Sequence, residues 1–186
     1  MRVASNPWLR PLARALPGAQ SRQFAEFAAA RGVRFGHAGR IPIADRTVDV
    51  LYTSHMLEHL DRREGRAFLA EAKRVLRPGG VLRIAVPDLR KLVDGYLATG
   101  DADDFVARTF MAVERPVSLR GRLLLLLFGF RAHRWMYDGP SLRRTLVDGG
   151  FRDVVVLKAG ETGIRDPGPL NLREREAESV YVEGRT

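Results

Sequence analysis

Residues 47–88 constrain the fold more than any other part of the chain, because they have the pattern of a strand, a helix and a second strand. β-Forming residues at 48–52 indicate the first strand, and residues 81–86 indicate the second. Between them, apolar residues recur at three- and four-residue steps after Asp61, which has a glutamate three positions later, as in a capping box. Pro78-Gly79-Gly80 is expected to end this helix. Because the crossover is long enough to join parallel strands, the sequence predicts an α/β fold.

Further helices and strands are predicted on both sides of this unit. The predicted helices cover residues 22–30, 89–97, 102–113 and 141–147, and the predicted strands cover residues 2–5, 33–37, 154–157 and 180–183. The last two strands lie late in the chain, where an antiparallel pair can complete a mostly parallel sheet. A chain of 186 residues is long enough for one core, so we expect a single domain over residues 1–186, with a helical lid inserted at about 98–135.

Composition excludes several kinds of site and partner. The chain has no cysteine, which excludes disulfides, thiolate zinc sites and cysteine nucleophiles. Its net charge is +9, but the arginines are scattered and no interleaving of aromatic with basic residues indicates RNA binding, so we expect no nucleic-acid partner. Residues 1–20 lack the apolar core of a secretory signal, and the longest apolar run, at 123–130, is far shorter than the roughly 20 residues of a membrane span. We therefore expect a cytoplasmic protein.

The densest group of reactive side chains follows the first strand of the unit at residues 47–88. His55, Glu58 and His59 would lie on one face of a helical turn, because they are three and four residues apart. Ligands of open α/β sheets bind beyond the carboxyl ends of the strands, so a site is expected here. Two imidazoles and a carboxylate can move a proton or bind a metal at neutral pH. Alternatively, Glu58 and His59 brace the loop through backbone hydrogen bonds.

The same segment has the pattern H-x-x-E-H, which is also the zinc signature of inverted metalloproteases. A zinc site of that class lies within a long helix and needs an acidic ligand far downstream. Here the segment follows a predicted buried strand and stops at Asp61. We therefore expect no metal site.

Three segments together resemble a known family. They are residues 41–60 (IPIADRTVDVLYTSHMLEHL), 71–80 (EAKRVLRPGG) and 84–88 (IAVPD). They resemble the class I S-adenosylmethionine-dependent methyltransferases, especially the short bacterial members encoded near polysaccharide or glycan biosynthesis genes. Residues 133–138, 150–151 and 178–183 look like the closing segments of that group. The resemblance implies a Rossmann-like methyltransferase sandwich, with a mostly parallel sheet and an antiparallel C-terminal strand pair.

The resemblance also implies a cofactor, an acceptor and the residues that serve them. S-adenosyl-L-methionine is the implied cofactor, and a small molecule or a glycan is the implied methyl acceptor. His55 or His59, beside Glu58, would be the catalytic base for a hydroxyl acceptor. The implied cofactor-binding residues are Ser5, Asn6, His37, Ala38, Gly39, Thr53, Ser54 and His55.

The chain departs from the family pattern at the cofactor site. Ser5 and Asn6 stand where the family has a Gly-rich turn, Gln23 falls near the usual ribose-binding carboxylate, and His37 replaces a common aspartate. These departures leave three interpretations: an active enzyme, a degenerate methyltransferase fold that serves as a binding or scaffold module, or a Gly-rich strand missing from the start of the sequence. Some relatives with an E-x-x-E-H version of the loop bind a divalent metal, and His55 departs from that version as well.

The segment at 120–131 is rich in leucine and phenylalanine and is flanked by arginines. Such a segment can lie on an anionic membrane as a peripheral contact. We favour the ordinary alternatives, which are a buried helix, a lid over the acceptor pocket or a dimer contact. His133, Trp135 and Tyr137 follow it and could line an acceptor site or pack in the core.

Overall fold

The structure is a computed structural model that describes residues 36–112, 118 and 132–186. By its contacts the chain divides into two units, Met1–His37 and Ala38–Thr186, and every element below belongs to the second. Several features predicted from the sequence lie outside the described residues: the strand at 2–5, the helix at 22–30, most of the strand at 33–37, Ser5, Asn6, Gln23 and the segment at 120–131.

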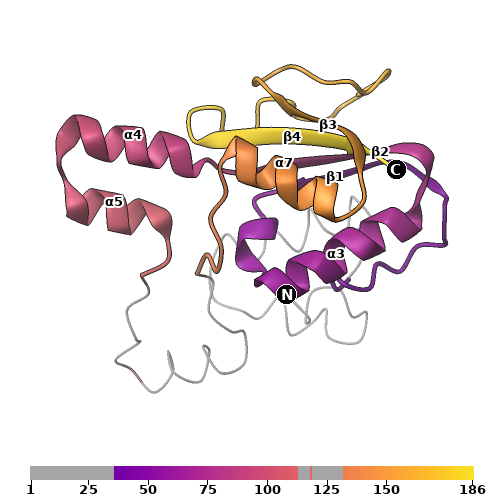
Figure 1. The fold of residues 1–186 in the computed structure, drawn as a ribbon, viewed down its shortest axis with the longest axis horizontal. Helices are drawn as coiled ribbons and strands as arrows, with labels where there is room; N and C mark the ends of the chain where they lie inside the picture. Colours follow the sequence, from indigo (N-terminus) through magenta and orange to yellow (C-terminus); the bar gives the residue numbers. More distant parts are fainter. Residues whose placement is uncertain (1–35, 113–117, 119–131) are drawn as a thin grey trace. The chain divides into compact units, whose positions relative to one another are not determined.

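A four-stranded sheet organises the second unit (Figure 1). Its strands are β1 (Val48–Ser54), β2 (Leu76–Pro87), β3 (Arg152–Leu157) and β4 (Ser179–Arg185), in the spatial order β1-β2-β4-β3. β1 and β2 are parallel, whereas β4 is antiparallel to both of its neighbours. The sheet confirms the predicted α/β fold with an antiparallel C-terminal pair, and β4 inserts between β2 and β3.

Two helices cover one face of this sheet. α3 (Arg62–Val75) joins β1 to β2, and α7 (Gly139–Asp148) precedes β3. Apolar residues of both helices share one core with Leu82, Ile84 and Val86 of β2. Both helices begin at an aspartate that completes a capping box, as predicted at Asp61, and these bonds satisfy amide groups that the first helical turn leaves unpaired. The capping box and the packing against the core therefore fix the start of α3, which follows β1 in the chain.

A second pair of helices follows β2. α4 (Leu89–Thr99) and α5 (Ala102–Thr109) contact each other through the rings of Tyr96 and Phe105, whose centroids are 5.4 Å apart. α5 is shorter than predicted, because Phe110 takes a left-handed φ of +51° and ends the helix. None of the helices in the described ranges is long and apolar enough to cross a membrane.

β2 begins earlier than the sequence predicted. Its first residue is Leu76, which pairs with Val48, and the ladder is irregular before Val81. Pro78-Gly79-Gly80 therefore lies inside the strand rather than ahead of it. The glycines are needed there: Gly79 has a φ of +76°, and a Cβ on Gly80 would lie 2.9 Å from the carbonyl oxygen of Arg77.

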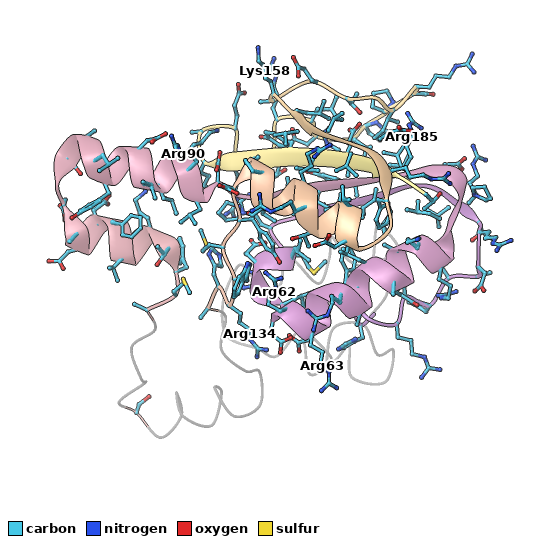
Figure 2. The ribbon with its side chains drawn as sticks, in the orientation of Figure 1. Arg62, Arg63, Arg90, Arg134, Lys158 and Arg185 are labelled. Carbon is cyan, nitrogen blue, oxygen red and sulfur yellow. The ribbon has the colours of Figure 1, made fainter. Side chains whose placement is uncertain are left out.

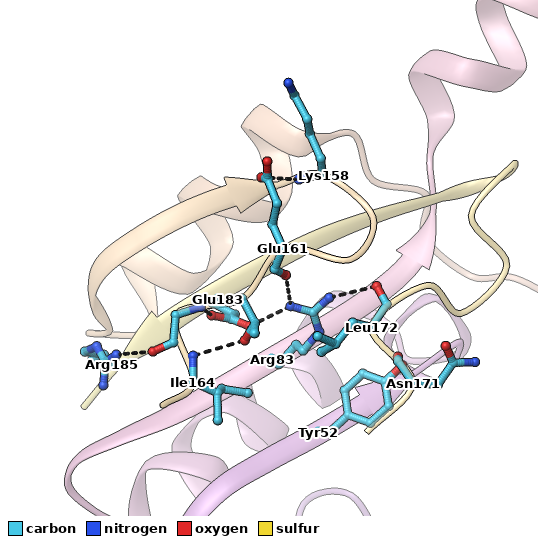
Figure 3. Close-up of polar contacts among 11 residues, drawn as sticks. Tyr52, Arg83, Lys158, Glu161, Ile164, Asn171, Leu172, Glu183 and Arg185 are labelled. Carbon is cyan, nitrogen blue, oxygen red and sulfur yellow. Dashed lines mark hydrogen bonds and ion pairs between the residues drawn. The ribbon is translucent and has the colours of Figure 1, made fainter. Parts of the chain in front are cut away.

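The loop between β3 and β4 lies on the other side of the sheet from α3 and α7 (Figure 1). Arg83 points to that side, between the core residues Leu82 and Ile84, and is fully buried. Its guanidinium donates hydrogen bonds to the Glu183 carboxylate on β4 and to the carbonyl oxygens of Glu161 and Leu172 in the loop (Figure 3). One buried cation thus ties the loop to the sheet.

Candidate functional site

The carboxyl end of β1 carries residues expected to contact a cofactor. Thr53 and Ser54 are half-buried and pair with Ile84 and Ala85 of β2. His55 follows with a φ of +48°, and its backbone N–H donates to the carbonyl oxygen of Ala85 at 2.9 Å. Non-glycine residues seldom adopt this left-handed conformation, and such strain is concentrated at functional sites. The strained residue turns the chain from β1 into the short 3-10 helix η2 (Leu57–His59).

Glu58, in η2, is the centre of a group of titratable side chains. Its side chain is only 1% exposed, and among the described residues neither carboxylate oxygen has a hydrogen-bond partner. Oε1 lies 3.5 Å from Nδ1 of His55. The same oxygen lies 3.9 Å from Nε2 of His59 and 3.9 Å from Nε2 of His133. These four residues, His55, Glu58, His59 and His133, are called the Glu58 cluster below.

The backbone fixes most of this cluster in place. The Glu58 carbonyl oxygen accepts the N–H groups of Arg134 and Trp135, at 2.7 and 3.2 Å, so the segment containing His133 is held against η2. Nδ1 of His59 lies 3.2 Å from the carbonyl oxygen of Ala132. The rings of His59 and His133 meet edge to face, with centroids 5.0 Å apart. Segments far apart in sequence are therefore joined by main-chain bonds, which a change of side chain does not remove.

Burial shifts the pKa values of Glu58, His55 and His133. It raises the pKa of Glu58 to about 7, and the positive charge of Arg175 acts in the opposite direction. Burial also lowers the pKa of His55, with a smaller contribution from Arg175. It lowers the pKa of His133 too, assisted by the neighbouring His59. Neutral imidazoles have a lone pair on one ring nitrogen, so the cluster has the groups needed to accept a proton or to hold a cation.

The structure brings together the three predicted catalytic residues and adds a fourth. His55, Glu58 and His59 meet as the spacing predicted, although a strained turn and η2, rather than one continuous helix, place them. The sequence indicates His133 only as an acceptor-lining or core residue, because no local spacing connects it to Glu58. Tyr137, by contrast, is a core residue at 2% exposure.

The predicted cofactor-binding residues are only partly described. Ser5 and Asn6 lie outside the described residues, and His37 is exposed at the end of the first unit. Ala38 is half-buried and packs against the core of the second unit, and Gly39 is half-buried beside it. The role of these residues as cofactor contacts stays a prediction.

The residues at the end of β1 fit the methionine portion of S-adenosylmethionine. Thr53 and Ser54 have small side chains with hydroxyl groups, which can hydrogen-bond to an amino-acid group. Ala85, which pairs with Ser54 on β2, is also small. Thr53, Ser54 and the backbone of His55 would hold the cofactor here.

A cavity of about 330 Å³ is lined by residues of α7 and of the segment that follows His133. Its lining includes Trp135, Arg62 and Arg144. The guanidinium of Arg62 lies 4.8 Å from the centre of the Trp135 ring. Figure 2 shows Arg62 and Arg134 near the start of α3, and Arg134 donates to the Glu64 carboxylate at 3.1 Å. The cavity thus combines an aromatic surface with basic groups and with the carboxylates of Asp138 and Asp148.

Comparisons with known proteins identify a family model and relatives that are similar to parts of the chain. Residues 11–84 match the family model described as "Methyltransferase domain". Over 57 residues the chain is 39% identical to a Mycolicibacterium smegmatis protein named "Probable S-adenosylmethionine-dependent methyltransferase", a match covering 30% of this chain and 21% of that protein. The matches span about a fifth of the length of the curated relatives.

Two solved structures share the fold. A SAM-dependent methyltransferase from Methanosarcina mazei is 18% identical, with a TM-score of 0.50 over 91% of this chain and 78% of that chain. The PH0226 protein from Pyrococcus horikoshii is 18% identical, with a TM-score of 0.51 over 90% of this chain and 68% of that chain. The chain therefore has the fold of the Rossmann-like methyltransferases, as predicted. The partial match to the family model and the similarity to a relative named as a probable S-adenosylmethionine-dependent methyltransferase are the basis of the function proposed below.

Proposed function

We propose that the protein transfers a methyl group from S-adenosyl-L-methionine to a hydroxyl group of a small-molecule or glycan acceptor, and that the Glu58 cluster takes up the hydroxyl proton. The observation that carries the proposal is the position of the cluster. It places imidazole nitrogens around a buried carboxylate within a few residues of the end of β1, where the fold places its ligands.

His59 is the best-placed base in this proposal. Its Nδ1 lies 3.2 Å from the carbonyl oxygen of Ala132, so Nδ1 holds the proton and the lone pair is on Nε2. The side chain is 40% exposed, so an acceptor can approach it from solvent. A proton taken up at Nε2 lies 3.9 Å from Oε1 of Glu58, and the ionised form of this carboxylate stabilises the imidazolium.

S-adenosylmethionine supplies an electrophilic methyl group when it is bound. The contribution of the chain is to align the acceptor oxygen with that group and to remove the proton. His55 helps to fix the geometry, because its Nε2 lies 2.9 Å from Oγ of Ser179 on β4. The strained backbone of His55 is thereby held by the sheet through both its amide and its side chain.

The cavity beside Trp135 supports a polar acceptor such as a glycan. An aromatic ring offers a flat apolar surface, while Arg62 and Arg144 offer hydrogen-bond donors around it. A glycan has both apolar ring faces and hydroxyl groups, which suits this lining. Nucleic acid is not among the proposed partners, and peripheral membrane contact through residues 120–131 stays a prediction.

The proposal is tested in two steps. Equilibrium dialysis with labelled S-adenosylmethionine should show saturable binding at one site per chain. An absence of binding would instead support the degenerate, scaffold interpretation. With an acceptor found by labelled-methyl transfer to a glycan panel, His59→Ala should lower turnover about 100-fold, since general bases contribute 10²- to 10⁴-fold. Cofactor affinity should stay within about threefold.

Lys158→Ala provides the matched control for that variant. Lys158 is an exposed cation on the loop after β3 (Figure 2), and its removal should leave turnover and cofactor affinity unchanged. Unchanged turnover in His59→Ala would remove His59 from the mechanism.

A further inference from the structure

The Glu58 cluster also contains a set of ligand atoms suited to a metal ion. Glu58, His59 and His133 each offer one ligand atom, and the three atoms all lie within 4.8 Å of one another. We propose that these three residues bind one divalent transition-metal cation, of the class of Zn²⁺, Mn²⁺ or Co²⁺. The binding itself does not depend on the proposed methyl transfer.

The distances are close to those of a metal site. Oε1 of Glu58 lies 3.9 Å from Nε2 of His59 and 3.9 Å from Nε2 of His133. Ligands of a tetrahedral zinc ion at about 2.0–2.2 Å are roughly 3.3 Å apart, so Glu58 and each histidine must approach each other by only about 0.6 Å. Small rotations of the side chains achieve this, because the His59 and His133 rings already meet edge to face.

The carboxylate of Glu58 is an independent indication of a ligand. Its side chain is 1% exposed, and within the described part of the chain both of its oxygens lack a hydrogen-bond partner. A buried polar group without a partner is costly, and buried carboxylates are usually paired or bound to a metal. A cation between Glu58 and the two histidines would supply the missing partner.

The surroundings of His59 are those of a metal-binding histidine. Such a histidine usually donates its second ring N–H to a carboxylate or a backbone carbonyl, which fixes the ring and leaves the other nitrogen free to bind. Nδ1 of His59 lies 3.2 Å from the carbonyl oxygen of Ala132, and Nε2 faces Glu58. The backbone bonds from Arg134 and Trp135 to Glu58 keep the neighbouring His133 segment in place.

The donor set selects the class of cation and the role that it can have. Two imidazoles and one carboxylate favour zinc, manganese, iron or cobalt over magnesium or calcium, which prefer oxygen ligands. Three protein ligands leave at least one position open for an oxygen atom. A bound cation occupies the lone pair on Nε2 of His59, so the proton transfer proposed above belongs to the chain without the cation.

His55 lies outside this donor set, and His133 replaces it. Nε2 of His55 contacts Ser179 at 2.9 Å, so the ring is already held by the sheet. The expectation of no metal rested on the local H-x-x-E-H segment alone. The third ligand comes instead from a distant segment that the fold brings back to η2.

The experiment uses the full chain without a histidine tag, stripped of metal by a chelator. Zn²⁺ is titrated by calorimetry, and Co²⁺ is followed by its visible absorption, which reports the ligand geometry. We expect one cation per chain. His133→Ala and Glu58→Gln should each weaken binding at least tenfold, whereas His37→Ala, which changes a histidine outside the cluster, should leave the affinity unchanged.

Several results would overturn the metal site. They are the absence of Zn²⁺ binding, binding that survives His133→Ala unchanged, or binding that is lost in His37→Ala. Circular dichroism establishes that each variant is folded, and His133→Ala decides the question if Glu58→Gln does not fold. S-adenosylmethionine binding is measured on the same samples, so loss of one ligand site is distinguished from loss of the other.

Discussion

Two buried glutamates of this molecule have opposite surroundings. Glu183, on β4, is 3% exposed and accepts hydrogen bonds from Arg83 at 2.6 Å, from Oγ1 of Thr162 at 2.6 Å and from the N–H of Gly163 at 2.7 Å (Figure 3). Glu58 is 1% exposed, and no described residue forms a hydrogen bond to its carboxylate. The protein itself completes the environment of one carboxylate and leaves that of the other incomplete.

The difference separates a structural group from a functional one. The network of Glu183 joins β2, β4 and the loop between β3 and β4, so its hydrogen bonds hold the fold together. Glu58 contributes no side-chain hydrogen bond of this kind, yet the backbone around it is well connected. Burying an unsatisfied carboxylate is a cost that evolution retains mainly where a ligand or a reaction uses the group.

The largest predicted effect concerns the partner of Glu183. Arg83→Met should lower the free energy of unfolding by about 3–5 kcal/mol, because it leaves a buried carboxylate without its cation. Urea denaturation followed by circular dichroism measures this loss. The double variant Arg83→Met/Glu183→Leu should lose less, since replacing both charges removes the unpaired group. A double variant that is less stable than the single one would contradict a structural ion pair.

A smaller effect is expected from the hydroxyl group that also contacts Glu183. Oγ1 of Thr162 donates to the carboxylate and accepts the N–H of Ile164 at 3.0 Å. Thr162→Val should therefore lower the free energy of unfolding by about 1–2 kcal/mol, as for a hydrogen bond to a charged group. Thr99→Val, at an exposed helix end, is the control and should cost less. Equal losses of stability in the two variants would show that the hydrogen bond from Thr162 to Glu183 does not stabilise the fold.

The smallest effect on stability is expected where β4, which carries Glu183, contacts the Glu58 cluster. Ser179 is buried on β4, and its Oγ lies 2.9 Å from Nε2 of His55. Ser179→Ala should cost about 0.5–1.5 kcal/mol of stability, the value of one ordinary hydrogen bond. In nitrogen NMR spectra the ring signals of His55 should move, while those of His59 stay in place. Equal movement of both rings would show that the cluster responds as one unit, against the role assigned to Ser179.

Much of the fold followed from local patterns in the sequence. Short runs of β-forming residues predicted β2, β3 and β4, and the capping box at Asp61 predicted the start of α3. The start of β2 was missed because Pro78-Gly79-Gly80 is typical of a turn, whereas here it forms an irregular edge of the strand against β1. The register of β4 between β2 and β3 depends on contacts that local periodicity does not contain.

The site was predicted only where its residues are neighbours in sequence. His55, Glu58 and His59 were found because they follow a strand, but His133 joins them through backbone bonds from the segment 132–135. The sequence indicates that Arg83 needs a buried partner, because it is a charged residue within an otherwise apolar strand. That signal did not identify Glu183, because pairing between β2 and β4 determines which residues face each other.

Glu58 and Glu183 are thus retained for different reasons, function for the first and stability for the second. The free energies of unfolding of Glu58→Gln and Glu183→Gln, measured by urea denaturation of the metal-free protein, test this difference most directly. We expect a loss of about 3–5 kcal/mol for Glu183→Gln, which breaks a buried ion pair, and a change below about 1 kcal/mol for Glu58→Gln, which removes no hydrogen bond. Equal losses in the two variants would show that the two glutamates have the same role.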